Sequence, residues 1–347
     1  MGAADLLVAV VAVGILIFLH EAGHFAVAKA LGVRVRAFSI GFGPALVRVR
    51  RGETAYQLSL VPFGGYVMFD DAQPPSPAAD ARAFEAQSAG RRALIAVAGV
   101  AANLVVALGV LVALYGAYGL PTVQVRVASV VAHSPASAAG LRPGDVLVRV
   151  GGVAVSRDPG AIPAVVAAHA DRPLAVVFRR DGSLHRAEVV PRPQAPGKPA
   201  RMGVYLQESL GYGGAGTWWA RLGAAWHSAG SMLSLLLVGL GQLFTGQVAP
   251  SQLGGPVRIV AETSQVAASG APALLYWLAL LSANLAVLNA IPFPGLDGGR
   301  LAFLLGEVLA RGRRNVRVEQ AINLIGLVVL MLFIGALTVQ DIARLHP

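Results

Sequence analysis

The stretch His20-Glu21-Ala22-Gly23-His24 decides how the rest of this 347-residue chain is interpreted. It lies inside an apolar run that begins near Leu6 and continues through Ala28. On a helix, residues four apart lie one turn above each other on the same face, so both imidazoles can reach one metal ion while Glu21 lies beside them. The sequence therefore predicts a helix over residues 6–30 that carries a metal site with a base attached.

A simpler interpretation is that these three polar residues only end the helix of a soluble core. The composition argues against it, because 55% of the residues are hydrophobic and 13% are charged, whereas roughly a quarter are charged in a typical soluble domain. Ionisable groups within a membrane-length apolar segment cost on the order of 3 kcal/mol each and are functional by default. We therefore predict a polytopic α-helical membrane protein with an intramembrane metal site.

The charge and the absence of cysteine restrict the function further. The formal net charge is +10, which would suit nucleic acid as a partner. We exclude that partner because no recognition motif is present and because the arginines cluster beside apolar spans, as the positive-inside rule expects. Without cysteine, disulfides and thiolate metal sites are impossible, so a metal must take nitrogen and oxygen ligands.

Hydropathy divides the chain into alternating membrane and non-membrane segments. We predict about four transmembrane helices, which lie within residues 1–31, 93–121, 271–299 and 321–347. Between them we predict a cytoplasmic-side β-loop with its linker, a soluble domain, an interfacial or re-entrant amphipathic region, and a basic cytoplasmic loop, over residues 32–92, 122–205, 206–270 and 300–320. Basic residues that follow the first span place its C-terminal end, and hence the metal site, near the cytoplasmic face of the bilayer.

The β-loop is predicted from period-two alternation between residues 33 and 67, interrupted by Gly41-Phe42-Gly43-Pro44. It is either an ordinary cytoplasmic sheet or a sheet that lies against the metal site. In the second case its exposed edge could pair with an extended peptide, with Val47 and Val49 as the candidate positions. The amphipathic region contains a short apolar run at 232–240 with tryptophans before it, which favours an interface helix.

Two further sites lie in the later spans. Asn103 is a polar group within the second span, where it serves either helix–helix contact or the active site. The third span ends in Asn289-Ala290-Ile291-Pro292-Phe293-Pro294-Gly295-Leu296-Asp297-Gly298-Gly299, which breaks the helix. After three crossings Asp297 reaches the same side as the histidines, and we predict it as the third metal ligand instead of a capping residue.

Residues 122–193 resemble a PDZ domain, with predicted strands around the stretch Gly140-Leu141-Arg142-Pro143-Gly144-Asp145. The groove of that fold accepts an extended peptide by strand addition. The whole chain is similar to the site-2 proteases, the RseP-type intramembrane zinc metalloproteases. The matching segments are 20–24, 39–43, 62–67, 98–103, 253–256 and 289–299.

The resemblance implies that His20, His24 and Asp297 hold Zn²⁺, that Glu21 is the general base and acid, and that Asn103 and Asn289 help to hold substrate. It also implies a multi-pass protein of the bacterial inner membrane, with an extracytoplasmic PDZ domain and an active site near the cytoplasmic side. Its substrates would be single-pass membrane proteins, such as anti-sigma factors, cut within or near the membrane after a first extracytoplasmic cut. Val100, Arg300 and the single PDZ domain, where the Escherichia-type relatives carry two, depart from the family pattern.

Two other functions fit parts of the sequence. An ion carrier or channel could use an intramembrane His/Asp site, but the chain shows no repeated halves with matching broken helices. A catalytically silent membrane scaffold could act through the PDZ groove alone. The presence of Glu21, which binds no metal in the predicted site, favours the enzyme.

Overall fold

The computed structural model describes residues 3–69, 81–155, 159–193, 195, 197–247, 254–310 and 315–345. The residues outside these ranges belong to several of the predicted segments. They include 70–80 of the linker, 156–158 of the predicted soluble domain, Leu253 of the motif at 253–256, and 311–314 of the basic loop. The chain divides into two compact units. Met1–Leu114 and Ala225–Pro347 form the first, which we call the membrane unit, and Tyr115–Ala224 form the second, which we call the β-domain.

Five helices in the described part of the chain are long and apolar enough to cross a membrane. They are α1 (Ala3–Ala30), α2 (Ala89–Tyr118), α5 (Trp218–Phe244), α7 (Ala271–Ala290) and α9 (Val316–Leu345). The protein is therefore a multi-pass membrane protein. The prediction of about four such helices was one too few by this criterion.

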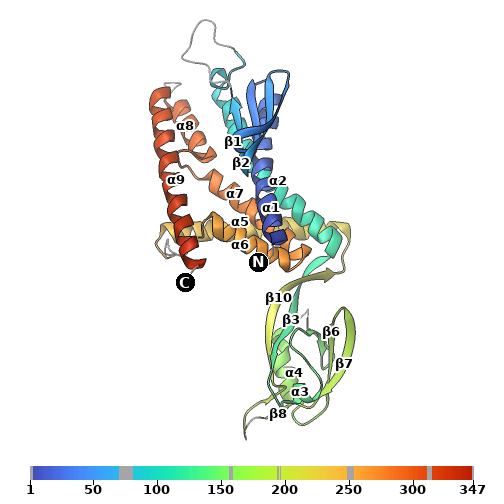
Figure 1. The fold of residues 1–347 in the computed structure, drawn as a ribbon. Helices are drawn as coiled ribbons and strands as arrows, with labels where there is room; N and C mark the ends of the chain where they lie inside the picture. Colours follow the sequence, from blue (N-terminus) through green and yellow to red (C-terminus); the bar gives the residue numbers. More distant parts are fainter. Residues whose placement is uncertain are drawn as a thin grey trace. The chain divides into compact units, whose positions relative to one another are not determined.

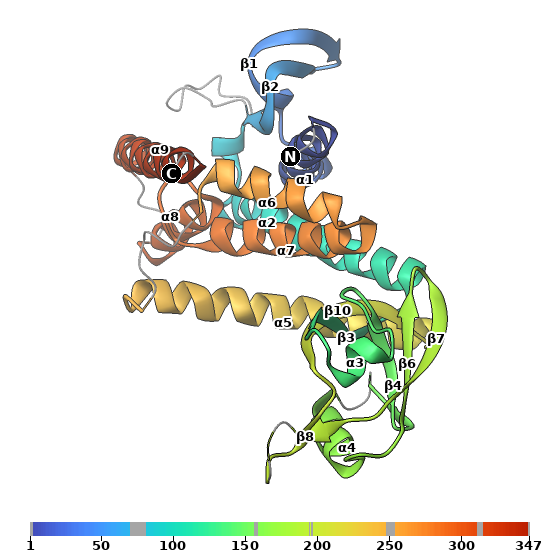
Figure 2. The same ribbon diagram turned by 60° about the horizontal axis from the view of Figure 1, so that its bottom comes forward.

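The additional helix is α5. The apolar run at 232–240 is short, but it belongs to one helix from Trp218 to Phe244, because no proline interrupts that segment. Figures 1 and 2 show the part of α5 in the membrane unit running crosswise to α1 and α9. The interfacial position of this segment stays a prediction, which the crosswise direction favours.

The helices α1 and α2 pack closely where the first carries its two histidines. A Cβ atom at Gly23 would lie 2.5 Å from the carbonyl oxygen of Ala98 and 2.6 Å from Cβ of Ala102. Only glycine permits this approach of two backbones. Toward the C-terminal end of α1, Ala28 and Ile95 join a small buried cluster with the first residues of the β-loop.

The predicted strands of the β-loop are confirmed, and their pairing is more complex than a simple hairpin. β1 (Val35–Arg51) pairs antiparallel with β2 (Thr54–Phe69). Residues 37–40 pair with 55–58 on one side and with 65–68 on the other, while 47–51 pair with 54–58. Gly41 and Gly43 have φ angles of 85° and 88°, which allow β1 to bend between its two halves. The sheet consequently has two outer edges, 45–51 and 65–69.

The β-domain is built around a six-stranded sheet in the order β10-β3-β4-β6-β7, with β5 paired to β4. The strands are β3 (Leu120–Val130), β4 (Val146–Val150), β5 (Val153–Ala154), β6 (Leu174–Arg180), β7 (Ser183–Val189) and β10 (Val204–Gly214). Two short helices, α3 (Pro135–Ala138) and α4 (Ile162–Ala168), and the small ribbon of β8 (Arg192–Pro193) and β9 (Ala200–Arg201) complete it. Its identity as a PDZ domain stays a prediction.

The predicted break after the third apolar segment is confirmed. α7 ends at Ala290, and α8 (Asp297–Leu309) starts after a connection of six residues, 291–296. A Cβ atom at Gly298 would lie 2.5 Å from the carbonyl carbon of Ala290, so this glycine lets the start of α8 fold back onto the end of α7. From α9, Asn323 accepts a hydrogen bond from the Gly295 amide at 3.2 Å and thereby holds the connecting loop. Among its described residues, the membrane unit also contains α6 (Pro256–Ala268) and a short 3-10 helix at Phe84–Ala86.

Candidate metal centre

Three side chains from two distant parts of the sequence meet inside the membrane unit. His20 and His24 lie one turn apart on α1, and Asp297 is the first residue of α8. The distance between the two histidine Nε2 atoms is 3.3 Å. Oδ2 of Asp297 lies 3.1 Å from each of them. All three side chains are buried, and together they could hold a metal ion.

The triangle of donor atoms has the dimensions of a zinc site. Ligand atoms about 2.0–2.1 Å from a tetrahedral zinc ion lie about 3.3 Å from one another. The three separations, 3.1, 3.1 and 3.3 Å, agree with that value. Two imidazole nitrogens and a carboxylate oxygen suit zinc, and three protein ligands leave the open position that is typical of catalytic zinc sites.

The proton on His24 supports a shared cation. Its Nδ1 atom lies 2.6 Å from the carbonyl oxygen of Ile95, which can only accept, so Nδ1 carries the proton. The Nε2 atom of a neutral His24 then has a lone pair and no proton to donate to Asp297. A cation between the two groups accounts for their close approach, since lone pairs on nitrogen and oxygen repel unless they share a positive charge.

Helix α2 holds the histidine rings from the other side. Gly99 faces them, and a Cβ atom at this position would lie 2.6 Å from Cε1 of His24 and 2.7 Å from Cε1 of His20. Asn103, one turn further along α2, places its amide nitrogen 3.1 Å from Nδ1 of His20. This side chain is fully buried. Both histidines therefore have their Nδ1 atoms against α2 and their Nε2 atoms toward Asp297.

Glu21 lies between the histidines in sequence and stands apart from the three-ligand cluster. It faces the β-loop, because a Cβ atom on Gly65 would lie 3.5 Å from Cγ of Glu21. The strand edge 65–69 thus passes beside Glu21. The carboxylate is free of the metal ligand set yet adjacent to it, which is the arrangement expected of a base.

The other predicted substrate-binding residues make no contact with the three clustered side chains in the described part of the chain. Val47 and Val49 are more than half exposed, and they belong to the outer edge 45–51, opposite the edge that passes Glu21. Asn289 lies in the last turn of α7 and donates a hydrogen bond to the Leu285 carbonyl oxygen at 3.0 Å. The structure gives none of the three a contact with the metal ligands in the described residues, and their roles in substrate binding stay predictions.

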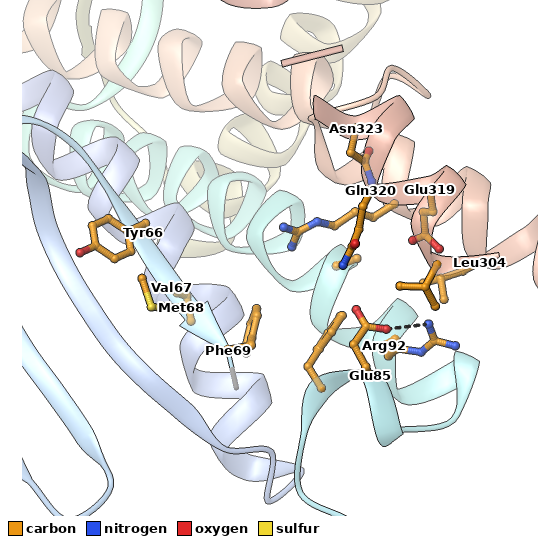
Figure 3. A pocket seen from close by; sticks show the side chains of 14 residues that line it. Tyr66, Val67, Met68, Phe69, Glu85, Arg92, Leu304, Glu319, Gln320 and Asn323 are labelled. Atoms are coloured by element: carbon orange, nitrogen blue, oxygen red, sulfur yellow. Dashed lines mark ion pairs between the residues drawn. The ribbon is translucent and has the colours of Figure 1, made fainter. Parts of the chain in front are cut away.

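A cavity of about 380 Å³ opens along the edge 65–69. Figure 3 shows Val67, Met68 and Phe69 of this edge on one side and Gln320 and Asn323 of α9 on the other. Its polar lining also includes Glu85, Arg92, Arg300 and Glu319.

One side of this cavity is fixed by a buried ion pair. Arg92 at the start of α2 bonds both carboxylate oxygens of Glu307 in α8, at 2.6 and 2.7 Å, and lies 3.7 Å from Glu85. Through Glu307 it ties α2 to the helix that begins at Asp297. Arg300 lines the same cavity one turn after Asp297.

The edge 65–69 is the part of the site that sequence reasoning missed. The signal was present in Pro62-Phe63-Gly64-Gly65-Tyr66-Val67, where two adjacent glycines indicate a close backbone approach. Period-two alternation describes both outer strands equally, so it could not identify which edge lies beside Glu21.

Comparisons with known proteins agree with this geometry. The family model described as peptidase family M50 matches residues 8–333. A protein of Clostridium perfringens that bears the name "putative zinc metalloprotease" is 32% identical over 96% of this chain and 97% of its own length. A protein of Synechocystis with the same descriptive name is 33% identical over 98% and 96%. The Arabidopsis thaliana protein named "probable membrane metalloprotease ARASP2, chloroplastic" is 32% identical over 95% of this chain and 78% of its own.

Proposed function

The chain belongs to peptidase family M50, the site-2 protease family of membrane zinc metalloproteases, and from this premise we propose that it cleaves single-pass membrane proteins within or near their transmembrane segment. The observation that carries the proposal is the buried triangle of His20, His24 and Asp297 beside the unligated carboxylate of Glu21. A carboxylate that lies beside a metal site without belonging to the ligand set suits hydrolysis, in which a base must take a proton from water.

The side chains divide the chemistry between them. Zinc, when bound, supplies a Lewis acid that polarises the scissile carbonyl and activates water. His20, His24 and Asp297 fix its position and leave one side open. Glu21 takes the proton of the attacking water and then gives it to the leaving amine. Burial of the ligands excludes bulk water from the reacting groups, which strengthens their electrostatic interactions.

Substrate must present an extended backbone to these groups. A transmembrane helix hides its peptide groups in its own hydrogen bonds, so it has to unwind before cleavage. The edge 65–69 carries no further strand on its outer side among the described residues, and it passes beside Glu21. An extended substrate paired with this edge would lie along the cavity in Figure 3 and close to the base.

Regulation and location follow from the resemblance. We propose that the protein lies in the bacterial inner membrane, with the metal centre near the cytoplasmic side and the β-domain as an extracytoplasmic PDZ domain. That domain would accept a peptide or screen the outer part of a substrate, so that cleavage follows a first extracytoplasmic cut. The lysine and arginines next to the C-terminal end of α1, Lys29, Arg34 and Arg36, support this orientation.

The test is co-expression with candidate tagged single-pass membrane proteins. Wild type should release a shorter tagged fragment, and Glu21→Gln should release none while retaining about one zinc per chain, because Glu21 is not a ligand. His20→Ala or Asp297→Ala should lose most of the zinc as well as the cleavage, since each removes one of three ligands. Cleavage at the normal rate by Glu21→Gln would overturn the mechanism. Zinc retained in both ligand variants would overturn the site.

A further inference from the structure

Asn103 lies against His20, one of the three residues of the proposed zinc site. Its amide is 3.1 Å from Nδ1 of His20, and both side chains are buried. The resemblance assigns this asparagine to substrate, but its contact is with the imidazole. The backbone around it is also fixed, because Ser282 of α7 donates to the Asn103 carbonyl oxygen at 2.8 Å.

The two histidines differ in the group that faces Nδ1. Ile95 offers His24 a carbonyl oxygen, which accepts the Nδ1 proton and leaves Nε2 free for the metal. His20 points its Nε2 atom at the same place, 3.1 Å from Asp297, so it too must carry its proton on Nδ1 when the metal is bound. That proton needs an acceptor.

The amide of Asn103 can supply this acceptor if its oxygen faces the ring. As placed, the amide nitrogen faces Nδ1 of His20, and Oδ1 is buried with no hydrogen-bond partner among the described residues. Oxygen and nitrogen of an amide occupy almost the same positions, and a half-turn exchanges them. As placed, the amide has a partner at one end only in the described protein, and the tautomer of His20 decides which end should face the ring.

We propose that Asn103 is a positioning residue for zinc: its Oδ1 atom accepts the Nδ1 proton of His20, which fixes the tautomer and ring orientation that present Nε2 to the metal. The amide thus does for His20 what the Ile95 carbonyl does for His24. The proposal rests on the zinc site of the proposed function, but it concerns the affinity for the metal and not the cleavage of a substrate.

Three substitutions separate this role from others. Asn103→Leu keeps the size of the side chain and removes the acceptor. Asn103→Asp keeps the acceptor and can only accept. Ser282→Ala removes the neighbouring hydrogen bond to the Asn103 backbone and leaves the side chain in place, so it is the matched control for loosened packing.

The measurement is competition for zinc by a chelator of known affinity, on the full-length protein in detergent, with thermal unfolding as the check on folding. Loss of such an orienting partner typically lowers metal affinity 10–100-fold. We expect Asn103→Leu to bind zinc about 10–100-fold more weakly, and Asn103→Asp and Ser282→Ala to stay within about threefold of wild type. In the cobalt-loaded protein, Asn103→Leu should also shift the visible absorption bands, which report ligand geometry.

Wild-type zinc affinity in a folded Asn103→Leu protein would overturn the proposal. So would an equal loss in Asn103→Leu and Asn103→Asp, because the aspartate retains the acceptor. Should Asn103→Leu fail to fold, Asn103→Ala, which also removes the acceptor, takes its place, and wild-type zinc affinity in that folded variant would equally overturn the proposal. His20→Ala separates a failure of this proposal from a failure of the proposed zinc site, because normal zinc binding by that variant would refute the zinc site itself.

Discussion

At the scale of single residues, the metal centre depends as much on a missing side chain as on the ligands. Gly99 has its Cα against both imidazoles, and a methyl group there would come within 2.6–2.7 Å of their Cε1 atoms. Those contacts are shorter than real Cβ contacts, so α2 or the rings would have to move. The movement would spoil a triangle whose sides have to match zinc within a few tenths of an ångström.

Gly99→Ala should therefore weaken zinc binding by at least about tenfold, the size of effect that follows when ligand orientation is lost. Gly109→Ala is the matched control, because it lies on the same helix and a Cβ atom there meets nothing within 4 Å. Chelator competition on the two purified variants gives the comparison. Equal zinc affinity in both would show that the rings tolerate displacement.

A second residue-scale prediction concerns acid and the β-domain. The Asp145 carboxylate is buried and accepts hydrogen bonds from Nε and Nη2 of Arg180, both at 2.7 Å, and from the Arg142 amide at 2.8 Å. Burial by itself raises the pKa of Asp145, but these three bonds together hold the pKa below its ordinary value of 3.8. Stability from this group is fully present above about pH 4 and is lost as the pH falls below it.

Hydrogen exchange of the full-length protein can detect this. β4 begins directly after Asp145, and β6 ends at Arg180. The backbone amides of these two strands should exchange faster after incubation well below pH 4 than at pH 7. In Asp145→Asn the protection should already be lower at pH 7 and should depend less on acid. If the hydrogen-exchange protection of Asp145→Asn depends on acid as strongly as that of wild type, another titrating group causes the dependence.

The cluster of three side chains that could hold a metal was predictable from sequence, and its surroundings were not. His20, His24 and Glu21 form a local pattern on one helix, and Asp297 follows a helix break whose prolines and glycines are visible in the sequence. The contact between Asn103 and His20 depends instead on how α1 crosses α2. That crossing is set by the close approach of the two helices at Gly23, which the spacing of apolar residues in the sequence does not reveal.

At the scale of elements, the β-loop has two outer edges, and only the edge 65–69 passes beside Glu21. Because residues 37–40 pair on both sides, the strand halves 45–51 and 65–69 form opposite edges of the same small sheet. Alternation in the sequence predicts strands but not this double pairing, which is why Val47 and Val49 were the candidate positions. α5 was not counted among the membrane-length helices for a related reason, since its strongly apolar run at 232–240 is short and does not show how apolar the whole helix is.

Proline substitutions can identify the edge that binds substrate, because proline removes a backbone donor and is tolerated only at a sheet edge. We expect one of Val67→Pro and Met68→Pro, the one whose amide points outward, to slow cleavage of every substrate at least about tenfold while zinc stays bound. Val47→Pro and Val49→Pro test the opposite edge as matched controls. Loss of cleavage confined to the last two variants would transfer substrate binding to the edge 45–51.

At the scale of the whole molecule, the division into two units separates chemistry from the β-domain. All three metal ligands, Glu21 and the cavity at the edge 65–69 belong to the membrane unit. No residue of the β-domain is required to complete the zinc site as described. A role in screening or recruiting substrate is therefore what the proposed PDZ domain can add.

Replacing residues 120–214 by a short linker should leave zinc bound and some proteolysis intact. The variant should also cut substrates whose outer domains have not been trimmed, because the element that excludes them is gone. Immunoblots of trimmed and untrimmed tagged substrates, with the same deletion in a Glu21→Gln background, provide the comparison. If the zinc-loaded deletion protein cuts no trimmed substrate, the β-domain delivers substrates and does not exclude them.

The choice of 120 and 214 follows from the first and last strands of the β-domain. β3 and β10 pair antiparallel along their lengths, from Val130 and Val204 to Leu120 and Gly214. The chain thus enters and leaves this domain at adjacent points on one two-stranded ribbon. Such a junction makes the domain a cassette: evolution can duplicate, exchange or discard it without rerouting the helices that flank the insertion.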